Sequence, residues 1–404
     1  SMTKIKPFKG FFPKQNLGAE ISTKPINTYT EEEIHQLMET NPDSFLNIIL
    51  HDEKEHKLEL KQRFQKTKYL FEEFIEKGKF QQSSKESFYI YRQSGNGSSY
   101  AGIIGGAFAG DYQNGRIKKH ELTLTKREKL FTKYLTYTGF NAEPVLLVYP
   151  KKKALSDLID QTVYSSPIHD FTSDDNLRHE LWEVSDAASI AVIESNFAEI
   201  PNVYIADGHH RSASSNRLSL QNKEKESTQF IMSLLMSDDA VHIYDFNRVI
   251  KNSEGLSYEQ LKEKLSSEFT VTEESENLLS PKDKHEFTLY LFNRWIRIKL
   301  KKDFNSNSEI IEQLDSQIIT DSILDPIFGI KELTKDKRVN FVPGNEGLHS
   351  LQEKVDKGNY DVAIAMYPVS FEELKLIADY NLIMPPKSTY IAPKLRSGLT
   401  VYKF

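Results

Sequence analysis

The sequence contains no cysteine among its 404 residues. This absence excludes disulfide bonds, thiolate metal sites and cysteine nucleophiles. Long apolar runs are missing as well, because the longest, at residues 101–109, is rich in glycine and far shorter than the roughly 20 residues that span a bilayer. The opening residues lack the charged-then-apolar pattern of a secretion signal. We therefore expect a cytoplasmic protein.

The sequence also lacks an excess of positive charge. It has 52 Lys and Arg against 58 Asp and Glu, which gives a net charge of −6. Nucleic-acid binding needs a basic face that contacts phosphates, so this balance argues against a general nucleic-acid partner. The remaining composition, 38% hydrophobic and 27% charged, is that of an ordinary folded protein, and the length predicts two or three domains.

One polar cluster stands out in the stretch VYIADGHHRSAS, at residues 203–214. The apolar residues before the cluster predict a short buried strand, and the Ser-Ala-Ser-Ser residues from Ser212 onward predict the opening of a helix. The cluster therefore lies on a strand-to-helix turn. A helix N-terminus presents unpaired N–H groups and a partial positive charge, so such a turn favours anions.

Each residue of the cluster suits the handling of phosphates. Gly208 allows close approach of the backbone, Arg211 can make a forked contact, and His209 and His210 can donate hydrogen bonds. Asp207 can coordinate a magnesium ion or orient a hydroxyl group. The alternative is that Asp207 caps the helix and the histidines are structural.

Strand and helix patterns alternate along the chain and predict a mixed α/β fold. Strands are predicted at 88–92, 100–108, 144–149, 178–184, 189–193, 203–206, 229–236, 287–292, 295–300 and 362–366, and helices at 31–40, 56–78, 154–163, 309–319, 346–357 and 371–380, with a further charged helix ending near 137. The glycine-rich stretch around residues 95–106 is interpreted as a hairpin and not as a phosphate loop, because it runs from strand to strand and no Gly-Lys-Ser/Thr follows it. Folds of this kind place ligands at the carboxyl end of a strand, where the polar turn lies.

We expect three regions. Residues 1–114 form an N-terminal αβ region with a hairpin, 115–250 form the core that carries the site, and 251–404 form a C-terminal αβ region. This last region ends in a basic tail, IMPPKSTYIAPKLRSGL at 383–399, in which two prolines fix the backbone. A rigid basic loop of this kind can close over phosphates, and its candidate residues are Lys387, Ser388, Thr389, Lys394 and Arg396. The alternative is a C-terminal strand on a sheet edge.

Three stretches together resemble a known family. These are IKKHE at 117–121 with a threonine two residues on, YIADGHHRSAS, and MPPKSTYIAPKLRSGL. With RHELW at 178–182 and NPDSFLNI at 41–48, they resemble the bacterial and archaeal family known as domain of unknown function 1015. The Asp-Gly-His-His-Arg run is also similar to the phosphate-binding motif of the ParB and sulfiredoxin-like superfamily, which includes free serine kinases.

The second resemblance implies a nucleotide-binding core and a reaction. The kinases carry a glutamate upstream of the motif as general base on the substrate hydroxyl, and the pair His120-Glu121 resembles that element. The resemblance thus implies Glu121 as the base, ATP or ADP with Mg²⁺ as the donor, and free L-serine as a first guess for the acceptor. It assigns the phosphates and the metal to Asp207, His209, His210 and Arg211.

The chain departs from these relatives in two places. The spacing from Glu121 to Asp207 is much longer than in the compact kinases, so an inserted segment must fold away from the site. Where the family often has Pro-Pro-Tyr-Asp, this chain has KPINTY at 24–29. The role of that aspartate is therefore not carried over.

Other interpretations stay open at this stage. The same site can serve a phosphatase acting on a small phosphoester such as phosphoserine. A non-catalytic nucleotide-binding or DNA-partition protein is a further alternative, opposed by the negative charge and by the lack of a basic helix-turn-helix segment. A metal site at His209 and His210 is another, although adjacent histidines in an extended turn point apart. The acceptor, the choice of ATP or ADP, the direction of the reaction and the oligomeric state stay undetermined.

Overall fold

The computed structural model describes residues 3–51, 58–305 and 308–404. The chain forms two compact units, Ser1–Val241 together with Pro393–Phe404, and His242–Ala392. In the described part of the chain, no helix has both the length and the hydropathy needed to cross a bilayer.

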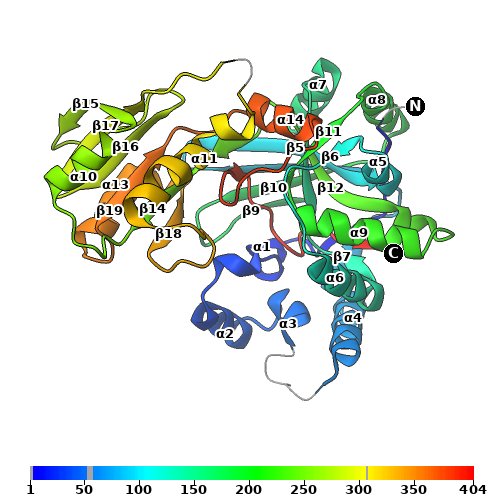
Figure 1. The fold of residues 1–404 in the computed structure, drawn as a ribbon. Helices are drawn as coiled ribbons and strands as arrows, with labels where there is room; N and C mark the ends of the chain where they lie inside the picture. Colours follow the sequence, from blue (N-terminus) through cyan, green and yellow to red (C-terminus); the bar gives the residue numbers. More distant parts are fainter. Residues whose placement is uncertain (1–2, 52–57, 306–307) are drawn as a thin grey trace. The chain divides into compact units, whose positions relative to one another are not determined.

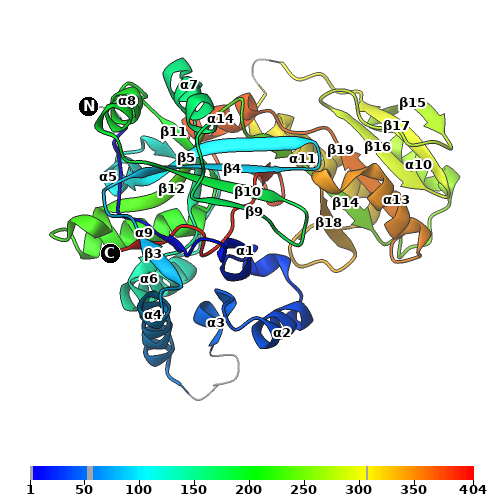
Figure 2. The same ribbon diagram turned by 180° about the vertical axis from the view of Figure 1, so that it is seen from behind.

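The first unit is built on a nine-stranded mixed sheet (Figures 1 and 2). From one edge to the other, its strands are β6 (Ile117–Lys118), β11 (Val203–Asp207), β8 (Val145–Tyr149), β12 (Phe230–Ser237), β5 (Ser98–Phe108), β4 (Phe88–Gly95), β10 (Arg178–Val184) and β9 (His169–Thr172), with β1 (Ile5–Lys6) paired to β5. The pairs β6/β11 and β8/β12 are parallel, and the other pairs are antiparallel. The predicted mixed α/β fold is confirmed, and strands from residues 1–114 and 115–250 share this one sheet.

The predicted hairpin of β4 and β5 is also confirmed. Asn96 and Gly97 turn the chain with φ values of 53° and 78°, as a two-residue hairpin of this type requires. The glycines of β5 serve close packing inside the sheet: a Cβ atom on Gly102 would lie 2.7 Å from the carbonyl oxygen of Leu235, and one on Gly105 would lie 2.7 Å from the ring of Phe88.

Helices cover both faces of this sheet (Figures 1 and 2). On one face, α7 (Lys153–Thr162) and α8 (Ala187–Ala198) pack against a fully apolar core. On the other face lie α9 (His209–Gln221) and α6 (Thr125–Thr138), which contact each other along their length, with the short α5 (Ala109–Gln113) against α9. This second face is the one next to the polar turn.

The strand predicted at 189–193 is wrong, because these residues lie inside α8. Asp186 caps this helix by accepting a hydrogen bond from the backbone N–H of Ser189. Ile193 and Phe197 are four residues apart and both fully buried, which is helical spacing. A short apolar run fits both a strand and a helix, and here the cap and the spacing decide for the helix.

The N-terminal segment adds a small aromatic core to the first unit. It contains β2 (Phe11–Pro13), α1 (Gly18–Ile21), α2 (Glu31–Thr40), α3 (Leu46–Ile49), α4 (Leu60–Glu76) and β3 (Phe80–Gln82). The helix predicted at 31–40 is confirmed, with a capping box at Thr30. The start of the helix predicted at 56–78 lies outside the described residues, and its described part is α4. The chain end returns to this core, where β21 (Tyr402–Lys403) pairs with β7 (Phe140–Asn141).

The second unit holds an antiparallel sheet. Its strands, in spatial order, are β15 (Phe269–Ser275), β17 (Arg294–Leu300), β16 (Glu286–Leu291), β19 (Val362–Met366), β14 (Phe246–Ile250) and β18 (Val339–Pro343). The core on one face is shared with α10 (Tyr258–Leu265), α11 (Asp315–Ile319) and α12 (Asp325–Phe328), and the core on the other with α13 (Gly347–Asp356). Also in this unit are α14 (Phe371–Asp379) and the pair β13 (His242–Tyr244) with β20 (Tyr390–Ala392).

Candidate active site

Two parallel strands bring the predicted site residues to one edge of the first sheet. Val203 of β11 pairs with Ile117 of β6, and Tyr204 pairs with Lys118. Because parallel strands end at the same edge, the chain that leaves β6 toward His120 and the chain that leaves β11 emerge side by side. Residues 89 positions apart in the sequence therefore meet.

The strand-to-helix turn itself is a single residue, Gly208. Its φ of 94° is left-handed, and this conformation favours glycine. A Cβ atom there would lie only 2.8 Å from Nη2 of Arg211, so a side chain at this position would displace the guanidinium. The helix α9 begins at His209, three residues earlier than predicted. Both histidines and Arg211 thus belong to its first turn, where backbone N–H groups have no partner within the helix.

His120, Glu121 and His209 form a close group at this turn. The backbone N–H of His120 donates a hydrogen bond to Nε2 of His209 over 3.3 Å. Nδ1 of His209 lies 3.4 Å from one carboxylate oxygen of Glu121, and Nε2 of His120 lies 3.8 Å from the other. The two rings meet edge to face, 4.5 Å between centroids. The structure therefore brings the upstream His-Glu pair to the Asp-Gly-His-His-Arg turn.

Burial keeps both imidazoles of this group neutral at neutral pH. Burial lowers the pKa of His120 to about 4, an effect that the nearby backbone of Ile205 partly offsets. The pKa of His209 is lowered well below its ordinary value, first by burial and then by its histidine neighbours. The Glu121 side chain, in contrast, is 50% exposed. A solvent-accessible carboxylate thus stands beside two buried, uncharged rings.

The His120 ring is buried and has few polar contacts. In the part of the chain that the structure describes, neither of its buried ring nitrogens makes a hydrogen bond of good geometry. Leaving buried polar atoms unpaired costs stability, and such exceptions call for a functional explanation. The ring lies beside the backbone of Ile205 and has its Nε2 3.8 Å from the Glu121 carboxylate, so His120 stays a candidate residue of the site.

The same group contains the atoms that a metal ion would need. Candidate ligand atoms of His120, Glu121 and His209 lie within 4.8 Å of one another, whereas His210 is not part of this set. However, Nε2 of His209 accepts a backbone N–H, so the proton of the neutral ring resides on Nδ1, the atom that faces Glu121. A metal ion bound to Nδ1 of His209 would require the ring proton to be on Nε2. That proton would point at the backbone N–H of His120, which is also a donor. The geometry therefore fits a histidine-carboxylate contact better than a metal centre.

Arg211 is held by the residues that precede β8. Its Nη2 donates to the carbonyl oxygen of Pro144 over 3.2 Å, and its Nη1 lies 3.4 Å from a carboxylate oxygen of Glu143. The hydroxyl of Ser397 donates to the other Glu143 oxygen over 3.3 Å. A guanidinium has five N–H donors, so these contacts orient Arg211 and leave it donors for a phosphate. No sequence signal marks Glu143, since an acidic residue before a strand is an ordinary feature.

His210 points in another direction from His209. It is half-buried, and its ring lies edge-on to Phe131 of α6 at 6.5 Å between centroids. Burial, followed by the charge of Arg127, lowers its pKa. The two histidines of the motif therefore have different surroundings.

The tail predicted to cover the phosphates is divided between the two units. Lys394 belongs to the first unit, and its Nζ lies 3.8 Å from a carboxylate oxygen of Asp207. Gln93 of β4 fixes this part of the tail by donating from its amide to the carbonyl oxygen of Lys394. The buried Arg396 donates two hydrogen bonds to Ser22, so its guanidinium holds α1.

The other tail residues lie in the second unit. The hydroxyl of Ser388 donates to the carbonyl oxygen of Pro385 and contacts the hydroxyl of Ser316. The carbonyl oxygen of Lys387 accepts a hydrogen bond from the fully buried Arg248, and Thr389 is half-buried beside it. Within this stretch β20 pairs with β13 in a two-stranded sheet of their own, whereas the strand alternative expected pairing at the edge of a sheet.

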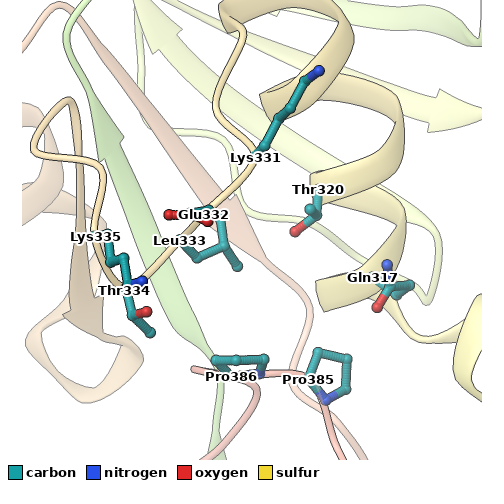
Figure 3. Close-up of a pocket in the computed structure, with 9 residues that line it drawn as sticks. All are labelled: Gln317, Thr320, Lys331, Glu332, Leu333, Thr334, Lys335, Pro385 and Pro386. Carbon is teal, nitrogen blue, oxygen red and sulfur yellow. The ribbon is translucent and has the colours of Figure 1, made fainter.

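A hollow of about 360 Å³ lies within the second unit (Figure 3). It is lined by Gln317, Thr320, Lys331, Glu332, Leu333, Thr334, Lys335, Pro385 and Pro386. All of these side chains are exposed or half-exposed, and the hollow contains none of the motif residues. It offers no buried polar group that would bind a ligand, so we place the candidate site at the turn.

Comparison with known proteins identifies the family. The family model for a protein of unknown function, DUF1015, matches residues 5–317, and the chain belongs to this family. A comparison with curated proteins found no match.

Several solved structures are similar at low identity. A free serine kinase in complex with AMP has 15% identity and a TM-score of 0.33, over 69% of this chain and 84% of that chain. A conserved hypothetical protein from Pyrococcus furiosus has 16% identity and a TM-score of 0.31, over 69% and 87%. SbnI from Staphylococcus aureus, truncated at its C-terminus, has 11% identity and a TM-score of 0.37, over 72% and 82%.

Proposed function

We propose that this protein is a phosphotransferase that moves a phosphoryl group from a nucleotide to a small hydroxyl-bearing metabolite. One observation carries the proposal: the Glu121 carboxylate lies 3.4 Å from the first residue of α9, at the turn opened by Gly208. A candidate base and a candidate anion site are thus adjacent. The motif resemblance supplies the first compounds to test, which are free L-serine as acceptor and ATP or ADP with Mg²⁺ as donor.

The proposed reaction needs positioning and charge neutralisation more than covalent chemistry. Glu121 accepts the proton of the substrate hydroxyl, and the hydroxyl oxygen attacks the terminal phosphorus of the nucleotide. The bond from phosphorus to the bridging oxygen breaks, and the shortened nucleotide leaves with the electron pair. The proton on Glu121 then passes to solvent, which its exposure permits.

The turn supplies the groups that neutralise the phosphates. The N–H groups of the first turn of α9 and its partial positive charge face the nucleotide, with Arg211 and Lys394 as flanking cations. Asp207 is the residue we assign to the magnesium of the nucleotide complex, because a half-exposed carboxylate suits that hard cation. Its neighbour Lys394 balances the carboxylate charge.

A nucleotide screen tests the binding half of this proposal. A ligand that binds only the folded state raises the melting temperature, so ATP, ADP and AMP are compared with and without Mg²⁺, followed by a panel of amino acids. We expect stabilisation by a nucleotide and further stabilisation by the acceptor. No shift with any nucleotide at millimolar concentration would contradict the proposal.

A product assay distinguishes the transferase from the phosphatase. L-serine with nucleotide, and phosphoserine without nucleotide, are incubated with the native protein and with Glu121→Gln. A transferase forms phosphoserine only in the first mixture. A phosphatase releases phosphate in the second, and that outcome would replace the proposal with the hydrolytic alternative. Glu194→Gln, an exposed carboxylate of α8, is the matched control.

A further inference from the structure

We propose that His209 is a positioning residue, which orients the Glu121 carboxylate through its Nδ1–H group. An effect of this contact on catalysis depends on the proposed function. The contact between His209 and Glu121 does not depend on it. The motif resemblance assigns His209 to the phosphates. The structure assigns it to the carboxylate instead.

The position of the His209 proton follows from one hydrogen bond. A backbone N–H can only donate, so Nε2 of His209 must accept the bond from His120 and cannot carry a proton of its own. A neutral imidazole has one N–H, which is therefore on Nδ1. That nitrogen lies 3.4 Å from the nearer carboxylate oxygen of Glu121, and its N–H dipole stabilises the negative charge.

The surroundings of Nε2 leave no place for a second proton on this ring. The side chain is only 3% exposed, and a doubly protonated ring would place a proton on Nε2 directly against the N–H of His120. The contact is thus one between a neutral donor and an anion.

The two partners differ in how firmly the fold holds them. His209 is the first residue of α9, packed edge to face against the ring of His120. Glu121 lies in the connection between β6 and α6, where its neighbours Leu122 and Leu124 are 75% and 67% exposed. Holding a glutamate side chain in one orientation costs rotamer entropy, so a fixed contact is needed to define that orientation. A donor fixed on a helix therefore selects the rotamer that faces the turn.

Two amide substitutions distinguish the roles of the two ring nitrogens of His209. In His209→Asn the amide nitrogen takes a position close to Nδ1, so a donor toward Glu121 remains. In His209→Gln the amide lies close to Nε2, so the contact with His120 remains and the donor toward Glu121 is lost. The pair thus compares the proposed positioning contact with the purely structural one.

Kinetics of these variants test the proposal. We expect His209→Gln to lower kcat by about 10²-fold with unchanged nucleotide Kd, because misplacement of a catalytic group has that order of effect. His209→Asn keeps most of kcat. Combining Glu121→Gln with His209→Gln should be no worse than Glu121→Gln alone. A normal kcat in His209→Gln, or an equal loss in both amide variants, would overturn the assignment.

The tautomer of His209 can be measured without any enzymatic turnover. Nitrogen-15 NMR of the full chain at neutral pH, with the ring signal identified by its loss in His209→Asn or its shift in Glu121→Gln, should show the Nδ1–H form. The Nε2–H form or an imidazolium would refute the contact. If no nucleotide or acceptor reacts but the Nδ1–H form is present, the proposed function fails and the geometry stands.

Discussion

The backbone N–H of His120 donates to ring atom Nε2 of His209 across 3.3 Å, although 89 residues separate them in the sequence. This bond joins the segments that follow the parallel strands β6 and β11. Because Nε2 faces His120, the other ring nitrogen, Nδ1, faces Glu121. The pairing of the two strands thus determines which atom of His209 contacts the candidate base.

Substitution of the candidate base is expected to separate chemistry from binding. Glu121→Gln keeps the size of the side chain but cannot accept the hydroxyl proton, so turnover should fall by roughly 10²- to 10⁴-fold. The nucleotide Kd, measured by calorimetry, should stay within about twofold of the native value. An unchanged rate would remove Glu121 from the mechanism, and Glu194→Gln should leave both quantities unaltered.

Gly208 is expected to matter both for stability and for nucleotide binding. Gly208→Ala forces a side chain into a left-handed conformation, which costs about 1–2 kcal/mol of unfolding free energy, and it displaces Arg211. Gly78 has a similar φ of 73° but open space around its Cβ position, so Gly78→Ala is the matched control.

Urea denaturation should show a loss of stability in both glycine variants. Calorimetry should show weaker nucleotide binding in Gly208→Ala alone. If Gly208→Ala binds nucleotide as tightly as Gly78→Ala does, the turn is not the anion site.

Arg211 is expected to contribute a forked contact to a phosphate. Arg211→Ala should weaken nucleotide binding by about tenfold or more, equivalent to ~1.4 kcal/mol, with Arg211→Lys between the two because lysine keeps the charge but not the fork. Arg178→Ala removes an exposed arginine paired with Asp170 and serves as control. Identical titrations for the native protein and Arg211→Ala would refute the role.

The buried histidines predict a loss of stability in acid. The pKa of His120 is about 4 in the folded chain, against an ordinary value of 6.5, so between these pH values the unfolded chain binds more protons. Stability should therefore fall as the pH is lowered from about 6.5 to 4, by up to about 1.4 kcal/mol per pH unit for each such histidine.

Chemical denaturation across this pH range measures the effect. His120→Gln should reduce the slope of unfolding free energy against pH, and His349→Gln, an exposed histidine, should leave it unchanged. A slope that is the same in all three proteins would show that His120 is not buried in its neutral form.

Local patterns predicted the elements around the site. The apolar run before Asp207 and the Asp-Gly pair predict a strand followed by a turn. These signals depend only on residues that are neighbours in the sequence. The first turn of α9 begins earlier than predicted because histidine and arginine give no strong helix-start signal. The strand prediction at 189–193 is wrong because short apolar runs fit both a strand and a helix.

Contacts between distant residues could not be predicted from such patterns. The position of Glu121 at the turn depends on β6, a strand of only two residues, which leaves almost no trace in the sequence. Similarly, nothing in the sequence indicates that Gln93 fixes Lys394, or that Arg396 bonds to Ser22. These pairings depend on how the C-terminal segment returns to the first unit.

The central claim is that Glu121 and the Gly208 turn together transfer a phosphoryl group. Its most direct test is to incubate the native protein and Glu121→Gln with L-serine, Mg²⁺ and either ATP or ADP carrying a labelled terminal phosphate, and to separate the products. We predict labelled phosphoserine from the native protein only, with nucleotide bound equally by both proteins. Label that stays in the nucleotide, or that reaches phosphoserine equally in both proteins, would contradict the account.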